Sequence, residues 1–231
     1  MTDKTTPLAE AVARITSGST VMVGGFGLPG TPMTLVAELF RQGQDDLTLI
    51  KNEANEPGMG ISLIIEAGRL RKLVLSHLGL NTKAIAMMNA GELDIEFHPQ
   101  GILAEKIRCG GAGLLGFVTD IGVDTIIAEN RQVMDVDGTR AIFEPCLRAD
   151  VALVHAARAD RYGNLVYTRT ARNFNPLMAQ AADLVIAEAA EVVDVGELDP
   201  DHVHTPGVFV DHVVDLGGLV DSYGVLEHHV V

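Results

Sequence analysis

The stretch Val21-Met-Val-Gly-Gly-Phe-Gly-Leu-Pro-Gly-Thr-Pro32 decides the fold of this chain. Its three leading apolar residues predict a short buried strand, and the glycines that follow predict a tight turn. Thr31 is the predicted N-cap of the next helix, and Pro32 is its predicted first residue. A strand that runs through a glycine turn into a helix leaves backbone N–H groups available to an anionic ligand.

Length and composition limit what the chain can be. Its 231 residues suffice for one α/β domain with a substantial core, and 47% of them are hydrophobic. A mean hydropathy of +0.23 is high, so we expect an oligomer or an obligate partner. The formal net charge of -14 argues against binding to nucleic acid or to an anionic membrane surface. The polar N-terminus and the lack of an apolar run of about 18 residues predict a cytoplasmic protein.

Strand and helix patterns alternate along most of the chain. Apolar runs predict strands near residues 47–50, 72–76, 93–97, 151–155 and 184–188. Several of the intervening segments carry helical patterns, for example 82–90 and 175–182. This alternation predicts an α/β fold with an open, mostly parallel sheet flanked by helices. We expect one domain over residues 1–215 and a C-terminal tail over 216–231.

Three later segments break this alternation. Gln132–Val136 and Thr139–Glu144 flank the pair Asp137-Gly138, which is typical of a type I′ turn, and they predict a small β-hairpin at the edge of the sheet. The glycine-rich segment Cys109–Phe117 predicts a loop. The chain after Val195 is rich in Asp, Pro and His, and we expect it to wrap the surface.

The glycine turn permits two functional interpretations. Gly25, Gly27 and Gly30 form the pattern G-x-G-x-x-G, and Glu53 lies near the position of the acidic residue that binds the ribose of NAD. Pro29 stands directly before the third glycine, where the dinucleotide pattern already runs into the helix. The turn therefore indicates either a cradle for another phosphate-bearing ligand or the cofactor site of an NAD(P)-linked oxidoreductase.

Polar side chains follow the next predicted strands. Asn52, Glu53 and Asn55 stand at the carboxyl end of the strand at 47–50, where open α/β sheets bind their ligands. Gln100 follows a later strand in the same way, and its amide suits a carboxylate or a carbonyl group. We take Asn52 and Gln100 as candidate substrate-orienting residues.

Other reactive residue types give weaker signals. Cys109 has no assignable base nearby, so we interpret it as a small buried residue rather than a nucleophile. His202 and His204 have the spacing of metal ligands, but no third ligand accompanies them, so we predict no metal site. Glu129 follows an apolar segment, and we interpret it as a solvated strand end.

Several motifs, taken together and in this order, resemble one protein family. They are Met22–Phe26, Pro99–Gly101, Arg108–Gly113, Arg148–Leu153, Gly163–Leu165, Ala171–Pro176 and Gly196–Pro200. Over roughly residues 8–215 the chain resembles the alpha (A) subunit of the family I CoA-transferases. Within that family it is similar to the alpha subunit of acetate (or butyrate)–acetoacetate CoA-transferases. The resemblance implies the CoA-transferase fold, which is NagB-RpiA-like.

This resemblance also implies an activity and a partner. The enzyme would move CoA between a short-chain acyl-CoA or acetoacetyl-CoA and a carboxylic acid through a glutamyl-CoA thioester. The nucleophilic glutamate is implied in a beta subunit, so this chain would hold no catalytic residue and act only in a heteromer, usually α2β2. No cofactor is implied as permanently bound, because CoA is a substrate. The CoA-binding segment is implied at Gly24, Gly25, Phe26, Gly27, Leu28, Pro29 and Gly30.

Alternatives and departures from the family pattern remain. Within the family the chain could be the alpha (A) subunit of a 3-oxoacid or 3-oxoadipate CoA-transferase, and outside it an NAD(P)-binding oxidoreductase or a sugar-phosphate-sensing domain. Glu53 stands where 3-oxoacid relatives tend to have a second asparagine. Asp120 and Asp124 stand where relatives usually show Thr or Pro and Gly. If these aspartates point inward, we expect their charge to narrow the range of acids that are accepted.

Overall fold

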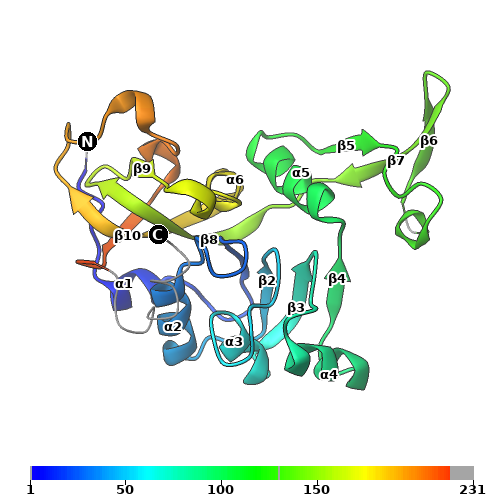
Figure 1. Ribbon diagram of the computed structural model, residues 1–231, viewed down its shortest axis with the longest axis horizontal. Helices are drawn as coiled ribbons and strands as arrows, with labels where there is room; N and C mark the ends of the chain where they lie inside the picture. The colour runs from blue at the N-terminus through cyan, green and yellow to red at the C-terminus, as the bar shows by residue number, and fades with distance from the viewer. Residues whose placement is uncertain (1, 130, 219–231) are drawn as a thin grey trace.

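The computed structural model describes residues 2–129 and 131–218 and is built on one large twisted sheet (Figure 1). In sheet order its parallel strands are β11 (His212–Asp215), β10 (Ala182–Val193), β8 (Ala149–Asp160), β1 (Thr20–Val23), β2 (Leu47–Ile50), β3 (Leu70–Leu75) and β4 (Ile95–Phe97). A short strand, β9 (Leu165–Val166), pairs antiparallel with β8. The strand that precedes the glycine turn therefore lies in the middle of the sheet.

Helices cover both faces of this sheet and divide the core into two halves (Figure 1). Val21 and Val23 of β1 pack into one half and Met22 into the other, because successive strand side chains point to opposite faces. One face is covered by α1 (Leu8–Val12), α2 (Met33–Gln42), α3 (Ser62–Glu66) and α4 (Thr82–Ala90), and the other by α5 (Gln100–Gly111) and α6 (Asn175–Gln180). The predicted α/β fold, with an open parallel sheet flanked by helices, is confirmed.

The last described strand was not predicted. The chain after Val195 was expected only to wrap the surface, and it does pass through the short 3-10 helices η3 (Pro200–His202) and η4 (Gly207–Phe209). It then enters the central sheet as β11, which runs parallel to β10. Only Val213 and Val214 are apolar in this strand, which is too short a run to indicate a strand in the sequence.

The prediction of a loop over Cys109–Phe117 is wrong at both ends. Helix α5 continues through Gly110 and Gly111, and strand β5 (Gly116–Thr119) begins soon after it. A Cβ on Gly110 would lie 2.0 Å from the carbonyl oxygen of Leu147, and one on Gly111 would lie 2.8 Å from Cβ of Gln180. These glycines allow α5 to pack tightly against its neighbours, so they report close packing rather than an irregular backbone.

The predicted hairpin exists but belongs to a sheet of its own. Strands β6 (Val133–Val136) and β7 (Thr139–Pro145) are joined by Asp137 and Gly138, whose φ angles of 51° and 81° are both positive, as a type I′ turn requires. Strand β5 pairs with β7, and the order is β5-β7-β6. The hairpin was expected at the edge of the central sheet, but this small antiparallel sheet lies beyond α5 and is not hydrogen-bonded to that edge (Figure 1).

Among the described residues, none of the helices has both the length and the apolar character needed to cross a membrane. Of the tail predicted over 216–231, residues 219–231 lie outside the part of the chain that the structure describes.

Candidate functional site

The glycine turn after β1 can be built only from glycine at several of its positions. Gly25 and Gly30 have φ angles of 101° and 74°, which side-chain-bearing residues rarely adopt. A Cβ on Gly24 would lie 1.9 Å from Oδ1 of Asn175, and one on Gly25 would lie 2.2 Å from Oγ1 of Thr31. Gly27 differs, because its Cβ would meet nothing closer than Cδ of Pro29 at 3.9 Å. The open side of the turn is therefore at Gly27.

The segment Ala171–Pro176 supports this turn from behind. Asn175 is fully buried, and its Nδ2 donates hydrogen bonds to the carbonyl oxygens of Gly30 (3.0 Å) and Ala171 (2.9 Å). Asn173 Nδ2 donates to the carbonyl oxygen of Pro29 at 2.9 Å. The two asparagines of one motif thus fix the backbone of another motif, although they are far apart in the sequence.

The predicted start of helix α2 is wrong by one step. Pro32 occupies the N-cap position, and the helix begins at Met33. Thr31 does not cap the helix, because its Oγ1 turns back and donates to the carbonyl oxygen of Gly27 at 2.7 Å. The first turn of α2 is capped from β10 instead, where the fully buried Glu188 accepts a hydrogen bond from Leu35 N at 2.9 Å.

The carbonyl group of Gly27 points into the protein. Its oxygen accepts hydrogen bonds from Thr31 Oγ1 (2.7 Å), Asn55 Nδ2 (3.0 Å) and Lys51 Nζ (3.4 Å). In a trans peptide the C=O and N–H groups point in opposite directions, so the N–H of Leu28 points outward. Neither Gly27 N–H nor Leu28 N–H has an acceptor within the described ranges, and both residues are partly exposed.

A buried ion pair lies directly under the turn. Lys51 is completely buried and pairs with Glu53, which also accepts hydrogen bonds from Nδ2 of Asn52 (2.8 Å) and of Asn55 (3.4 Å). Burial lowers the pKa of Lys51, and the charge and the hydrogen bond of Glu53 oppose that shift. The carboxylate of Glu53 is therefore fully engaged inside the protein.

Asn52 and Gln100, which follow different strands, meet at the carboxyl edge of the sheet. Gln100 Nε2 donates to Asn52 Oδ1 at 3.0 Å, and Ser76 Oγ donates to the same atom at 2.9 Å. Asn52 is buried with both the oxygen and the nitrogen of its amide bonded, whereas Gln100 is exposed. Ser76 was not singled out in the sequence, although its place directly after β3 was a usable signal.

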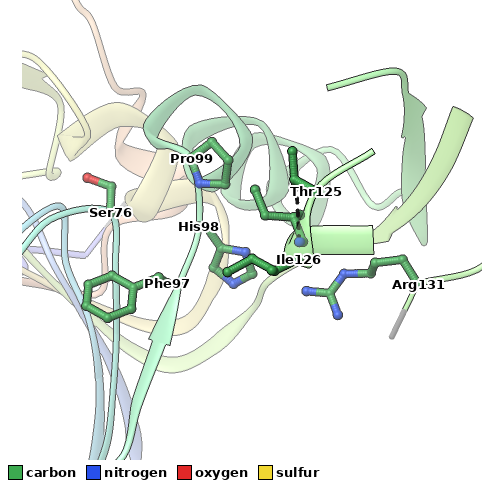
Figure 2. A pocket seen from close by; sticks show the side chains of 8 residues that line it. Ser76, Phe97, His98, Pro99, Thr125, Ile126 and Arg131 are labelled. Carbon is green, nitrogen blue, oxygen red and sulfur yellow. Dashed lines mark hydrogen bonds between the residues drawn. The ribbon is translucent and has the colours of Figure 1, made fainter. Parts of the chain in front are cut away.

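A pocket of about 510 Å³ begins beside this cluster (Figure 2). Ser76 lies at one end, and Arg131, which lies just before β6, lies at the other. Phe97, Pro99 and Ile126 contribute apolar walls between them, the last from the short 3-10 helix η1 (Ile126–Ala128). The edge of the sheet thus carries a glycine turn, a set of amides and a pocket in a row.

A comparison with known proteins identifies this arrangement. The sequence profile of the coenzyme A transferase family matches residues 5–216. The chain belongs to the coenzyme A transferase family. It is 47% identical to the alpha subunit of acetate CoA-transferase from Escherichia coli (strain K12), over 93% of this chain and 97% of that protein. It is 45% identical to the corresponding (A) subunit of a probable succinyl-CoA:3-ketoacid coenzyme A transferase from Bacillus subtilis (strain 168), over 89% of this chain and 86% of that protein.

Solved structures agree on the fold of this CoA-transferase subunit. The acyl-CoA transferase YdiF from Escherichia coli O157:H7, in a thioester complex with CoA, superposes with a TM-score of 0.84 at 22% identity. That likeness covers 95% of this chain and 48% of the solved one, so the chain spans about half of that protein's length. At this identity the likeness concerns the fold.

The dinucleotide interpretation of the turn does not fit the CoA-transferase subunit. Helix α2 begins at Met33, three residues after Gly30, whereas the dinucleotide pattern places its third glycine where the helix packs on the strand. Glu53 is 4% exposed and bonded to Lys51, so its carboxylate does not face a ribose. Among the described residues, no other carboxylate follows β2 directly.

The structure does not bring the remaining candidates of the CoA-transferase subunit together in one site. Cys109 is buried in α5, as predicted, and burial raises the pKa of its thiol. His202 binds Asp199 (2.7 Å between Nδ1 and Oδ2), whereas His204 stacks on Tyr167, so the metal-like spacing does not bring the two histidines to one site. Across residues 2–129 and 131–218 no group of three or more His, Cys, Asp or Glu side chains could hold a metal ion.

Asp120 and Asp124, which depart from the family pattern, were expected to narrow the range of accepted acids if they point inward. They do not point inward. Asp124 is exposed, and its Oδ1 accepts a hydrogen bond from Arg140 Nη1 at 2.7 Å on the small sheet. Asp120 is also exposed, and neither side chain lines the pocket. Glu129 is exposed as expected.

Proposed function

We propose that the chain is the alpha subunit of a heteromeric CoA-transferase, which moves CoA between a short-chain acyl-CoA or acetoacetyl-CoA and a carboxylic acid. The observation that carries this proposal is the orientation of the glycine turn. Three donors hold the Gly27 carbonyl inward, which leaves the N–H of Leu28 facing outward, and Gly27 N–H has no acceptor among the described residues. Gly24–Gly30 is then this subunit's share of the CoA site.

The proposed reaction needs a carboxylate that this chain does not supply. A glutamate side chain of the beta subunit attacks the thioester carbonyl of acyl-CoA. This attack forms an acyl-glutamyl anhydride and releases the CoA thiolate. The thiolate attacks the glutamyl carbonyl, so the acid leaves as a carboxylate and the enzyme carries a glutamyl-CoA thioester. An incoming carboxylate reverses both steps. Every bond that breaks is replaced by one that forms, and no oxidant or external proton is consumed.

The glycine turn contributes to this reaction in two ways. Negative charge develops on an oxygen each time a tetrahedral intermediate forms, and a fixed backbone N–H at that oxygen typically contributes about 10²–10³ in rate. The turn also binds the remote parts of CoA, whose binding energy offsets the high energy of the anhydride. The support by Asn175 and Asn173 keeps these N–H groups in place before the substrate arrives.

Gln100 is the residue that would contact the acid substrate. Its Nε2 is held by Asn52 Oδ1, and its exposed side chain leaves a carbonyl oxygen and a second N–H for the ligand. Asn52 is buried, and its amide oxygen and nitrogen are both bonded within the protein, so it acts as a positioning residue for Gln100.

Exposed apolar side chains at the same edge support a partner subunit there. Phe26 in the turn is 48% exposed, Phe97 at the end of β4 is 48% exposed, and Ile126 is 82% exposed. Large apolar residues that gather at one edge favour a protein interface. The proposed assembly is an α2β2 heterotetramer whose active site is completed by the beta subunit.

One experiment tests the proposal as a whole. The chain is co-expressed with its beta subunit, incubated with acetoacetyl-CoA and analysed by mass spectrometry for a CoA adduct. An adduct on a glutamate of the beta subunit supports the proposal, and full CoA transfer by the isolated alpha chain would refute it. Titration of the complex with a nicotinamide cofactor tests the oxidoreductase alternative, which predicts saturable binding.

The variant Gly27→Ala tests the turn itself. Its methyl group would enter open space on the outer side of the turn, so we expect kcat/KM for the acyl-CoA to fall by about tenfold or more. Gly91→Ala is the matched control, because Gly91 has a similar φ (73° against 63°) and open space around it, at the end of α4. Equal losses in both variants would show that backbone strain, and not a blocked ligand, is the cause.

A further inference from the structure

The pocket beside Gln100 has a polar side chain at each end and mostly apolar walls between them. Ser76, whose hydroxyl is bonded to Asn52, stands at one end, and Arg131 stands at the other (Figure 2). Most of the wall between them is apolar and comes from Phe97, Pro99, Ile126 and Ile127, and His98 and Thr125 also line it. A ligand that matches this pocket has an oxygen function at each end of a short carbon chain.

The Arg131 end of the pocket carries one unmatched positive charge. Arg131 Nε lies 3.2 Å from both carboxylate oxygens of Glu144, and Lys106 Nζ lies 2.8 Å from Glu144 Oε2. Lys106 and Glu144 are buried, so these three groups form one cluster with two cations and one anion. Burial acts to raise the pKa of Glu144. The hydrogen bond and charge of Lys106 and the charge of Arg131 act in the opposite direction, and the net effect lowers that pKa, so Glu144 stays ionised.

Two nearby carboxylates are bound to other cations. Asp124 is bound to Arg140, and both side chains are exposed. Glu96 is bound to Lys72, with His98 Nε2 also 2.9 Å away. In a chain whose formal net charge is -14, a cluster with an excess cation at a pocket favours an anionic or strongly accepting ligand.

The guanidinium group of Arg131 is both held and available. Only Nε is bonded to Glu144, and within residues 2–129 and 131–218 neither Nη1 nor Nη2 has an acceptor. The side chain is 24% exposed, and Figure 2 shows it extending towards Ile126 and His98. The bond to Glu144 fixes one edge of the fork, so the free N–H groups are positioned before a ligand binds.

We infer that Arg131 determines which acids the enzyme accepts, because it donates hydrogen bonds to a second oxygen function of the acid while the reacting carboxylate lies near Gln100. The second function is a carboxylate or a keto oxygen, and both present the same acceptor chemistry to Arg131. The enzyme therefore prefers 3-oxo acids or dicarboxylic acids to plain fatty acids of equal length. This inference rests on the proposed function.

Three four-carbon acids separate the possibilities. Butyrate has no second oxygen function, acetoacetate has a keto oxygen, and succinate has a second carboxylate. The kcat/KM of each acid is measured with one acyl-CoA donor on the purified complex of alpha and beta subunits. The variants are Arg131→Met, which removes the donors, and Arg131→Lys, which keeps a charge. Arg140→Met is the matched control, because Arg140 lies in β7 of the neighbouring small sheet and also binds a carboxylate, but it does not line the pocket.

The measured quantity is the ratio of kcat/KM for an oxygen-bearing acid to that for butyrate. We expect Arg131→Met to lower the ratio for acetoacetate, for succinate or for both by about 10- to 100-fold, the usual effect of losing hydrogen bonds from a charged group. Arg131→Lys should keep the ratio within about threefold. The acid whose ratio falls identifies the keto oxygen or the carboxylate as the ligand.

Two results would overturn the inference. Unchanged ratios in Arg131→Met, or the same fall in Arg140→Met, would show that Arg131 only braces the small sheet. If Arg131→Met fails to assemble, Arg131→Gln replaces it, because a glutamine still bonds Glu144, and its ratios decide in the same way. Transfer to none of the three acids by the unmodified complex would instead refute the proposed function, and this inference with it.

Discussion

The support of the glycine turn can be tested by the substitution Asn175→Ala. Asn175 Nδ2 donates to Gly30 O (3.0 Å) and to Ala171 O (2.9 Å), and its Oδ1 accepts from His155 N (3.1 Å). Alanine removes all three hydrogen bonds and leaves the backbone unchanged. The site is fully buried, so water does not replace the lost partners without local opening.

The expected magnitude follows from these three bonds. Each typically contributes about 1 kcal/mol net, so the local structure should lose about 3 kcal/mol. A loss of about 2–3 kcal/mol in the free energy of local opening corresponds to about 30- to 150-fold faster amide exchange, since 1.4 kcal/mol is a factor of ten. The affected amides are those of Gly24, Phe26 and Thr31, which have backbone acceptors in or beside the turn.

The assay is hydrogen–deuterium exchange of the peptide at residues 21–32 in the complex with the beta subunit. KM for the acyl-CoA is measured on the same preparation and should rise, because the turn is no longer fixed. Asn89→Ala is the control: Asn89 is exposed on α4, so exchange in the peptide should not change.

Two outcomes would refute this reasoning. Exchange within about threefold of the unmodified protein would show that the turn holds itself without Asn175. Faster exchange with an unchanged KM would show that Asn175 supports the turn but that CoA binds elsewhere.

Two further predictions concern buried charges. Glu53→Gln leaves Lys51 buried without its counter-ion and should lower the free energy of unfolding, measured by urea titration, by about 3–5 kcal/mol. The double variant Glu53→Gln with Lys51→Met should recover most of that loss, because no unpaired charge is then buried. Equal losses in the single and the double variant would contradict the pairing. Glu144 has a pKa below its usual 4.5 in the folded chain, so its stabilising effect is present above about pH 4.5 and is lost as the pH falls through the lower, folded-state value. Thermal midpoints measured between pH 7 and pH 3 should therefore fall less steeply for Glu144→Gln than for the unmodified protein, and parallel curves would count against this assignment.

The central sheet was predictable because parallel strands are buried on both faces. Runs such as Leu47–Ile50 are then mostly apolar and stand out from the polar turns around them. Gly110 and Gly111 misled the prediction, because the same residue type marks flexible loops and close helix packing. Only the positions of Leu147 and Gln180, which come from other parts of the chain, distinguish the two cases.

The sequence predicted that the site lies at the carboxyl edge of the central sheet, but not which residues outside that edge complete it. The rule that ligands bind at the carboxyl ends of parallel strands placed Asn52 and Gln100 together, and the structure shows them hydrogen-bonded. The contribution of Arg131 depends on how the segment around the small sheet lies against the large sheet, which no local pattern encodes. The same holds for Asn175, whose motif was noted but whose contact with the turn requires the packing of α6 on β8.

The position of Glu53 explains why an ion pair is buried under this site. One oxygen of its carboxylate binds Lys51 and Asn55, which both bond the Gly27 carbonyl, and the other binds Asn52, which bonds Gln100. A buried ion pair contributes little stability compared with apolar residues of the same size, so stability alone does not account for it. Group transfer, however, requires that the CoA thioester and the acid be held at a fixed separation. On the proposed function, a single carboxylate sets that separation, because it is bonded to the supports of both substrates.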